Sequence, residues 1–235
     1  MTEAEWLACE DPRLMLEALS GRASAPRLWR FAAFCWRRGW QFLKDGTSHR
    51  GVEAIEALAR GEALDDRQLL LLEDGSGFSI DLKDVPFGVG ISRDPSQAGA
   101  VARSSLDAVA MAESAETGAG YASLWALIVG DAVAAEQAPE VAQGRLAAIR
   151  RFEPLVRDFF GNPFRSIAFS PEWRSSTVIA LAREMDQSSD YSAMPILADA
   201  LQDAGCACDE VLSHCRGGGP HIRGCWVVDL VLGKE

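Results

Sequence analysis

The sequence predicts a mainly α-helical protein, and three observations lead to this fold class. Apolar residues recur at helical spacing in several stretches, most clearly over residues 25–44. Residues that favour helix caps precede these stretches, and glycines follow several of them. Residues 97–160 are rich in alanine. Since 48% of the 235 residues are hydrophobic, we expect a single compact multi-helix domain over 1–235 with a Gly/Cys/His-rich C-terminal loop.

Capping signals predict short helices at the start of the chain. Thr2 and Glu5 have the spacing of a capping box, in which each side chain satisfies a backbone amide of the first turn. Asp11 followed by Pro12 is typical of an N-cap with proline at the first helical position. Ser24 is expected to cap the next helix.

The predicted helix over 25–44 has an apolar half and a basic half. The apolar half is expected to be core. The basic face carries Arg27, Arg30, Arg37, Arg38 and Lys44. Because the chain has 34 acidic residues against 23 basic ones, we expect this face to be solvated or paired with the protein's own carboxylates. The alternative is a docking face for an acidic partner or a nucleic-acid backbone.

Composition changes after two further predicted helices. The first covers 49–60 and ends at a glycine, and the second is short and is capped by Asp65. Residues 75–96 then combine Gly, Pro and Asp with short β-prone runs at 78–82 and 89–91. We interpret 75–96 as a loop or hairpin insertion.

The Ala-rich region predicts three helices, near 97–116, 121–137 and 139–160. Pro154 is expected either to kink the third helix or to start a new one, because proline lacks the amide that an interior position needs.

Turn signals divide the last third of the chain into short elements. Residues 161–165, Gly-Asn-Pro-Phe-Arg, are typical of a sharp turn. Helices are expected from a Ser176 cap to Asp186, near 193–204 and over 209–215. The last apolar run, 226–232, fits a buried strand or a helix, and the aspartate inside it favours the helix.

Potential metal ligands concentrate in residues 205–228, which hold four of the six cysteines and two of the three histidines. The predicted zinc ligands are Cys206, Cys215, His221 and Cys225. Four soft ligands at short spacing are what a tetrahedral structural zinc site needs. The spacing resembles that of a Cys-x8-Cys-x5-Cys-x3-His finger with the last two ligand types exchanged. Cys208 and His214 are further donors, so other sets of four remain open.

Two other interpretations of these cysteines remain open. They are buried small hydrophobic residues, or Cys215 is the nucleophile of a thiol enzyme with a histidine base. His214 is poorly placed for that role, since adjacent residues on a helix point about 100° apart. Arg216 and Arg223 flank the glycine-rich loop, and we expect them to bind an anion or to lower the pKa of a neighbouring thiol.

The net charge of −11 argues against non-specific binding to nucleic acid or to an anionic membrane, where basic surfaces supply the affinity. The first residues lack the pattern of a secretory signal, and the longest apolar run, 124–130, is too short to span a bilayer. Six cysteines without a signal are typical of reduced thiols, so a cytoplasmic location is expected.

Four segments resemble an uncharacterised family abundant in planctomycete genomes. They are residues 1–9, 158–165, 195–206 and 214–230. The family carries no assigned activity, so the resemblance implies no catalytic residue. It does imply that the Asn-Pro-Phe-Arg turn and the His-Cys loop belong to one unit, and that 75–96 is an insertion in this member.

The sequence contains no P-loop, dinucleotide fingerprint, His-Glu-x-x-His or Gly-x-Ser-x-Gly motif. We therefore expect a non-enzymatic protein-interaction or scaffold protein whose C-terminal loop is stabilised by zinc and whose partner is another protein. The alternative is a zinc- or thiol-dependent enzyme that uses the 206–225 loop. A third hypothesis is an RNA-binding protein with a finger-like loop, which the acidic charge disfavours.

Overall fold

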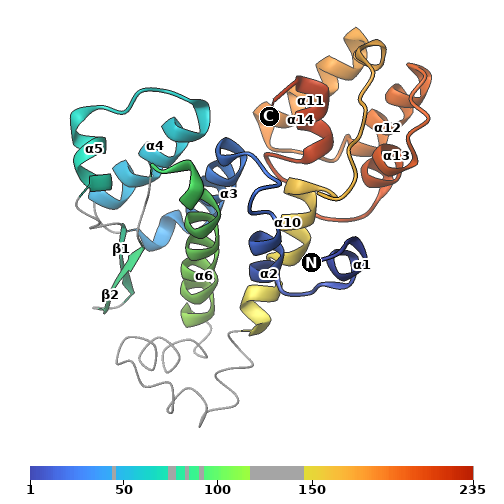
Figure 1. Cartoon of the computed structure of the whole chain (residues 1–235). Helices are drawn as coiled ribbons and strands as arrows, with labels where there is room; N and C mark the ends of the chain where they lie inside the picture. The colour runs from blue at the N-terminus through green and yellow to red at the C-terminus, as the bar shows by residue number, and fades with distance from the viewer. Residues whose placement is uncertain (44–45, 74–77, 83–84, 90–92, 117–145, 235) are drawn as a thin grey trace. The chain divides into compact units, whose positions relative to one another are not determined.

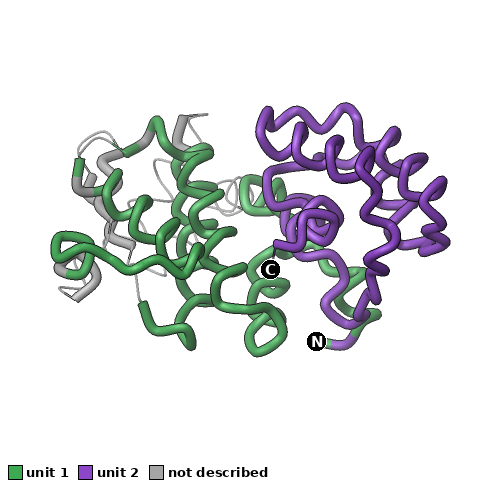
Figure 2. Tube along the Cα trace, turned by 90° about the horizontal axis from the view of Figure 1, so that it is seen from above, with its two compact units in different colours: residues 1, 3–153 green, residues 2, 154–235 purple. Residues whose placement is uncertain are grey.

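A computed structural model of the chain confirms the mainly helical fold class (Figure 1). It describes residues 1–43, 46–73, 78–82, 85–89, 93–116 and 146–234. The chain folds into two compact units (Figure 2). The first unit contains residues 1 and 3–153, and the second contains residues 2 and 154–235. The organisation of 1–235 as one domain stays a prediction.

The first unit contains the capped helices that the sequence predicts. Its main described helices are α1 (Glu3–Ala8), α2 (Pro12–Ala18), α3 (Ala25–Arg38), α4 (Gly46–Arg60), α5 (Asp66–Glu73) and α6 (Ala98–Glu116). Asp11 caps α2 by accepting from the Arg13 amide, and Ser24 caps α3 by accepting from the Arg27 amide. These local signals fix where the helices begin.

Helix α3 packs on α4 and α6 at the centre of the first unit. The indole Nε1 of Trp36 donates to Ser105 Oγ at 2.8 Å, so the two buried polar groups satisfy each other. The helix ends at Arg38, six residues before the expected end at 44, and a short 3-10 turn, η1 (Trp40–Phe42), follows. Gly39 explains the shorter helix, because glycine costs about 1 kcal/mol relative to alanine inside a helix.

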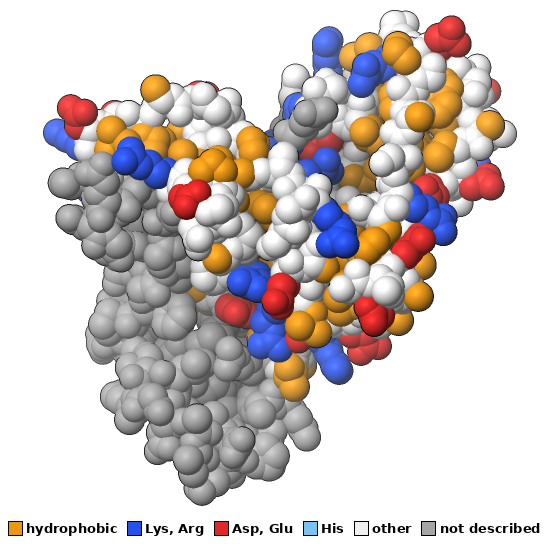
Figure 3. Space-filling view, viewed as in Figure 1, with side chains coloured by type: hydrophobic (Ala, Val, Ile, Leu, Met, Phe, Trp, Pro, Cys, Tyr) orange, Lys and Arg blue, Asp and Glu red, His pale blue; other side chains and the backbone are white. Residues whose placement is uncertain are grey.

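Two arginines of the basic face of α3 pair with the protein's own carboxylates. Arg37 makes two hydrogen bonds to Glu56, at 2.7 and 2.8 Å. Arg38 pairs with Glu113 at 2.6 Å. Acidic and basic side chains are also interspersed over the described residues on the face that Figure 3 shows. These pairs favour the self-paired interpretation of the basic face over a docking face.

An antiparallel strand pair lies between α5 and α6 in the chain. Strand β1 (Phe78–Leu82) pairs with β2 (Val85–Val89), with Phe78 opposite Val89 and Leu82 opposite Val85. The short 3-10 turn η2 (Pro95–Gln97) leads into α6. Whether 75–96 is an insertion stays a prediction. The predicted helix over 121–137 lies outside the described residues.

The second unit is built from short helices. They are α10 (Glu153–Phe160), η3 (Pro171–Trp173), α11 (Ser176–Ser188), α12 (Met194–Asp203), α13 (Asp209–Arg216) and α14 (Trp226–Leu232). Pro154 lies in the first turn of α10 and so starts a new helix, one of the two outcomes expected for it. The cap of α11 is Ser175, one residue before the predicted Ser176. The run over 226–232 is a helix, as the sequence favours.

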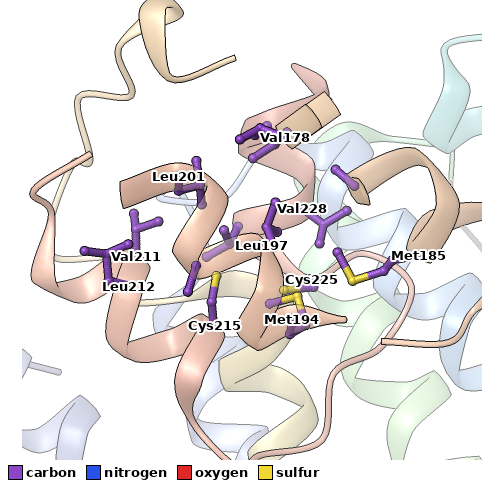
Figure 4. Close-up of a cluster of buried hydrophobic side chains, with 14 of the residues drawn as sticks. Val178, Met185, Met194, Leu197, Leu201, Val211, Leu212, Cys215, Cys225 and Val228 are labelled. Atoms are coloured by element: carbon purple, nitrogen blue, oxygen red, sulfur yellow. The ribbon is translucent and has the colours of Figure 1, made fainter. Parts of the chain in front are cut away.

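The apolar core of the second unit contains three of its four cysteines. Cys206, Cys215 and Cys225 are buried among side chains of α11, α12, α13 and α14, several of which are labelled in Figure 4. Valine, leucine and methionine supply most of the remaining contacts. Cys206 and Cys215 therefore act here as small hydrophobic residues, which is one of the interpretations that the sequence left open.

Two glycines allow the loop before α14 to approach α10 closely. Gly224 has a φ of +98°, and a Cβ at this position would lie 2.2 Å from Cε2 of Phe159. Gly161, directly after α10, has a φ of +64°, and its Cβ would lie 3.1 Å from the Trp226 indole. A side chain at either glycine would push the start of α14 away from α10.

Gly224→Ala should cost the protein much more stability than Gly205→Ala. Both glycines have positive φ, at +98° and +89°, so each substitution carries left-handed strain of about 1–2 kcal/mol. At Gly205 nothing lies within 4 Å of an added Cβ, whereas at Gly224 the buried Phe159 ring occupies the space. We expect Gly224→Ala to lose about 2 kcal/mol more unfolding free energy in urea denaturation. Equal losses would contradict this packing.

Candidate metal centre

Four side chains with metal-binding atoms converge in the second unit. Asp158 comes from α10, His214 from α13, and His221 and Cys225 from the segment between α13 and α14. One potential ligand atom from each of the four lies within 4.8 Å of all the others. The four side chains therefore form a cluster that is able to hold one ion.

The contacts inside this cluster share atoms. Asp158 Oδ1 lies 2.8 Å from His221 Nδ1 and 3.1 Å from His214 Nε2. The same His214 Nε2 lies 3.2 Å from Cys225 Sγ. Ligand atoms around a tetrahedral zinc ion are about 3.3–3.6 Å apart, given bond lengths of about 2.0–2.3 Å. Movements of a few tenths of an ångström would bring these contacts to that spacing.

Asp158 is the centre of the cluster and is buried, with 3% of its side chain exposed. Burial acts to raise the pKa of this carboxyl, but hydrogen bonds from His214, His221 and the Ile222 amide outweigh it and hold the pKa below its usual range. Oδ2 accepts from the Ile222 amide at 2.9 Å, which leaves Oδ1 to face the two histidines. Asp158 is therefore an ionised carboxylate with one oxygen directed at the cluster.

Cys225 supplies the sulfur of the cluster from the N-cap position of α14. Its pKa is raised well above the usual value, because the thiol is buried and because the Asp158 carboxylate is close. Without a nearby cation this thiol is protonated at neutral pH. A bound zinc ion would deprotonate it, since the ion favours the thiolate.

His221 faces the cluster through its Nδ1 atom. Its Nδ1 contacts Asp158, but its Nε2 is buried and has no hydrogen-bond partner in the part of the chain that the structure describes. A buried nitrogen without a partner costs about 1–3 kcal/mol. The donor set of one carboxylate oxygen, two imidazoles and one thiol is one that zinc accepts. The residues present therefore fit a zinc ion.

The local sequence explains how these side chains meet. His214 lies in the last turn of α13, and the Gly217–Pro220 segment after α13 leads the chain back toward α10. The packing of Gly224 on Phe159 brings that segment onto α10 next to Asp158. Trp226 then covers the His214 ring, with ring centroids 5.0 Å apart.

The structure brings together two of the four zinc ligands that the sequence predicts. His221 and Cys225 belong to the cluster, whereas Cys206 and Cys215 lie in the apolar core, with exposures of 3% and 0%. Burial raises the pKa of Cys215 to about 12 and outweighs the opposing effect of Arg216. The cluster therefore differs from the predicted set in two members, with Asp158 and His214 in place of these cysteines.

A signal for each of these two residues was present in the sequence. His214 was among the further donors that the sequence offered, and adjacent helical residues point about 100° apart, so His214 and Cys215 were not expected to face the same site. Asp158 lies 56 residues before His214, in the segment that contains the Asn-Pro-Phe-Arg turn. A search limited to cysteine and histidine spacing does not include a distant carboxylate.

The two arginines predicted to bind an anion have partners of their own. Arg216 donates to Asp199 Oδ1 at 2.9 Å and to Gln202 Oε1 at 2.6 Å. Arg223 donates to the Gln187 carbonyl at 3.3 Å. The Arg216 side chain therefore lies against the exposed face of α12, which carries Asp199 and Gln202. An anion-binding role for either arginine stays a prediction.

No family model, curated protein or solved structure matches this chain. The resemblance to the planctomycete family therefore stays a prediction. Among the described residues, no helix combines the length and the apolar character needed to cross a bilayer.

Cys225→Ala and Cys215→Ala form a matched pair that tests which cysteine binds the metal. Both thiols are fully buried in the same core, so both substitutions remove similar contacts. We expect Cys225→Ala to lose zinc and Cys215→Ala to keep it, because only Cys225 belongs to the cluster. Metal analysis of the two purified variants measures this. Loss of zinc from both would contradict the cluster and favour the set predicted from the sequence.

Proposed function

We propose that the second unit binds one structural zinc ion through Asp158, His214, His221 and Cys225, and that the protein is a non-enzymatic interaction or scaffold protein of the cytoplasm. The observation that carries the zinc proposal is that four donors, two of them buried, have ligand atoms that all lie within 4.8 Å of one another. Four protein ligands fill a tetrahedral shell and leave no position for water or substrate, which is typical of structural sites.

The charges of the proposed site balance. Zinc carries two positive charges, and the Asp158 carboxylate and the Cys225 thiolate each contribute one negative charge. A buried site with no net charge avoids most of the desolvation cost of an isolated ion. The ion would link α10, α13 and the start of α14, so it would hold together elements that are short and individually weak.

The cysteine chemistry supports a non-enzymatic role over the alternative of a thiol enzyme. Reactive thiols have lowered pKa values, but burial raises the pKa of both Cys215 and Cys225. A Cys-His-Asp relay also uses both nitrogens of one imidazole. Here one nitrogen of His214, Nε2, contacts both Cys225 and Asp158. This arrangement does not relay a proton through the ring, but it does direct three potential ligand atoms at one another.

The proposed partner is another protein. The net charge of −11 disfavours a nucleic-acid backbone and an anionic membrane as binding surfaces, and the pairing of Arg37 and Arg38 with glutamates further reduces the available positive charge. The cytoplasmic location is proposed because the six cysteines are all free thiols.

Removal of the metal should destabilise the protein. Full-length protein purified without chelator is expected to contain one zinc ion per chain. Treatment with EDTA should lower the melting temperature by more than about 5 °C, because an ion that binds the folded state stabilises it. Addition of zinc should restore the melting temperature. Metal-free protein with a melting temperature that does not respond to zinc would contradict the proposal.

Zinc affinity should increase with pH. The raised pKa of Cys225 means that zinc must displace a proton from this thiol. Below that pKa, each pH unit should increase the apparent affinity about tenfold. Competition with a chelator of known affinity between about pH 7 and pH 8 measures this dependence. An affinity that is independent of pH would show that Cys225 is not a ligand.

A further inference from the structure

A pocket of about 350 Å³ lies between α11 and the C-terminal end of α14, within the second unit. Its apolar side is formed by Ile179, Val231 and Leu232. Its charged side is formed by Arg174, Arg183, Asp186 and Lys234. None of these residues belongs to the metal cluster. The volume is at the lower end of the range for small-molecule sites, which is about 300–1,000 Å³.

Helix geometry explains why apolar and charged groups meet here. Ile179, Arg183 and Asp186 are spaced four and three residues apart, so they lie on one face of α11. Helix α14 ends at Gly233, whose φ of +66° reverses the chain and brings Lys234 toward α11. Lys234 Nζ pairs with Asp186 Oδ2 at 2.5 Å.

The charges in the pocket leave an excess of positive charge. The Asp186 carboxylate is paired with Lys234. The Arg174 guanidinium is held in place by the last turn of α14, donating to the Leu230 carbonyl at 2.9 Å and to the Val231 carbonyl at 3.1 Å. These carbonyls belong to the negative end of the α14 helix dipole, so the bonds orient the guanidinium and offset only part of its charge.

Arg183 adds a second positive charge without a carboxylate partner to the described lining of the pocket. Within the described part of the chain, its exposed guanidinium has no hydrogen-bond or ion-pair partner. Two arginines that have no carboxylate partner among the described residues therefore share one pocket, on a chain with a net charge of −11. A cleft lined by one sign of charge raises the local concentration of ions of the opposite sign.

We propose that this pocket binds a small phosphate monoester. The phosphate would be held by Arg174 and Arg183, since guanidinium groups match phosphate oxygens in geometry and charge. The apolar part of the ester would lie against Ile179 and Leu232. This site is separate from the zinc cluster and does not depend on the zinc proposal.

The test is calorimetric titration of the full-length protein, as purified without chelator, with phenyl phosphate. Saturable binding of phenyl phosphate is expected. Phenol lacks the phosphate group and inorganic phosphate lacks the apolar ring, so each should bind at least tenfold more weakly. Arg183→Ala should weaken phenyl phosphate binding by at least tenfold, which corresponds to about 1.4 kcal/mol.

Arg165→Ala is the matched control. Arg165 is also an exposed arginine of the second unit, but it pairs with Glu210 and does not line the pocket. This variant should bind phenyl phosphate like the unchanged protein, and thermal melts of both variants confirm folding. The proposal is overturned if binding does not saturate, if the two variants weaken it equally, or if benzoate binds as tightly as phenyl phosphate.

Discussion

The burial of Asp158 is the constraint on which the second unit depends. A carboxylate near the C-terminus of a helix faces the negative end of the helix dipole, and burial removes the water that would otherwise solvate it. Three groups compensate for this cost, namely the two imidazoles and the Ile222 amide. All three come from α13 or from the segment that follows it. The contacts that stabilise the Asp158 carboxylate therefore fix the path of the chain from α13 to α14.

Packing and polar contacts act together at this position. Phe159 is the neighbour of Asp158, and its ring occupies the space that a side chain at 224 would need. Cys225 follows Gly224 directly, with its sulfur both in the apolar core and against His214. A metal ion held at this junction would join the core of α11–α14 to α10. The cluster is thus where the apolar and the polar contacts of the second unit meet.

Sequence reasoning recovered the local features of the fold and missed the long-range ones. Caps such as Asp11 and Ser24 act within a few residues, so their spacing alone predicts where α2 and α3 begin. The pairing of Asp158 with His221 spans 63 residues and depends on how α10 packs. Spacing predicts that the loop has enough donors for a metal, but it does not decide which cysteines face the core. Cys206 and Cys215 fit an apolar core as well as they fit a metal site.

X-ray absorption spectroscopy of the zinc-loaded protein tests the central claim most directly, because it counts the sulfur atoms bound to zinc. The cluster of Asp158, His214, His221 and Cys225 predicts one sulfur ligand at about 2.3 Å and three nitrogen or oxygen ligands at about 2.0 Å. Two or three sulfur ligands would place a cysteine other than Cys225 on the metal, such as Cys206, Cys208 or Cys215, and would contradict the account. One sulfur ligand would support the role of Asp158 and His214 in holding the ion.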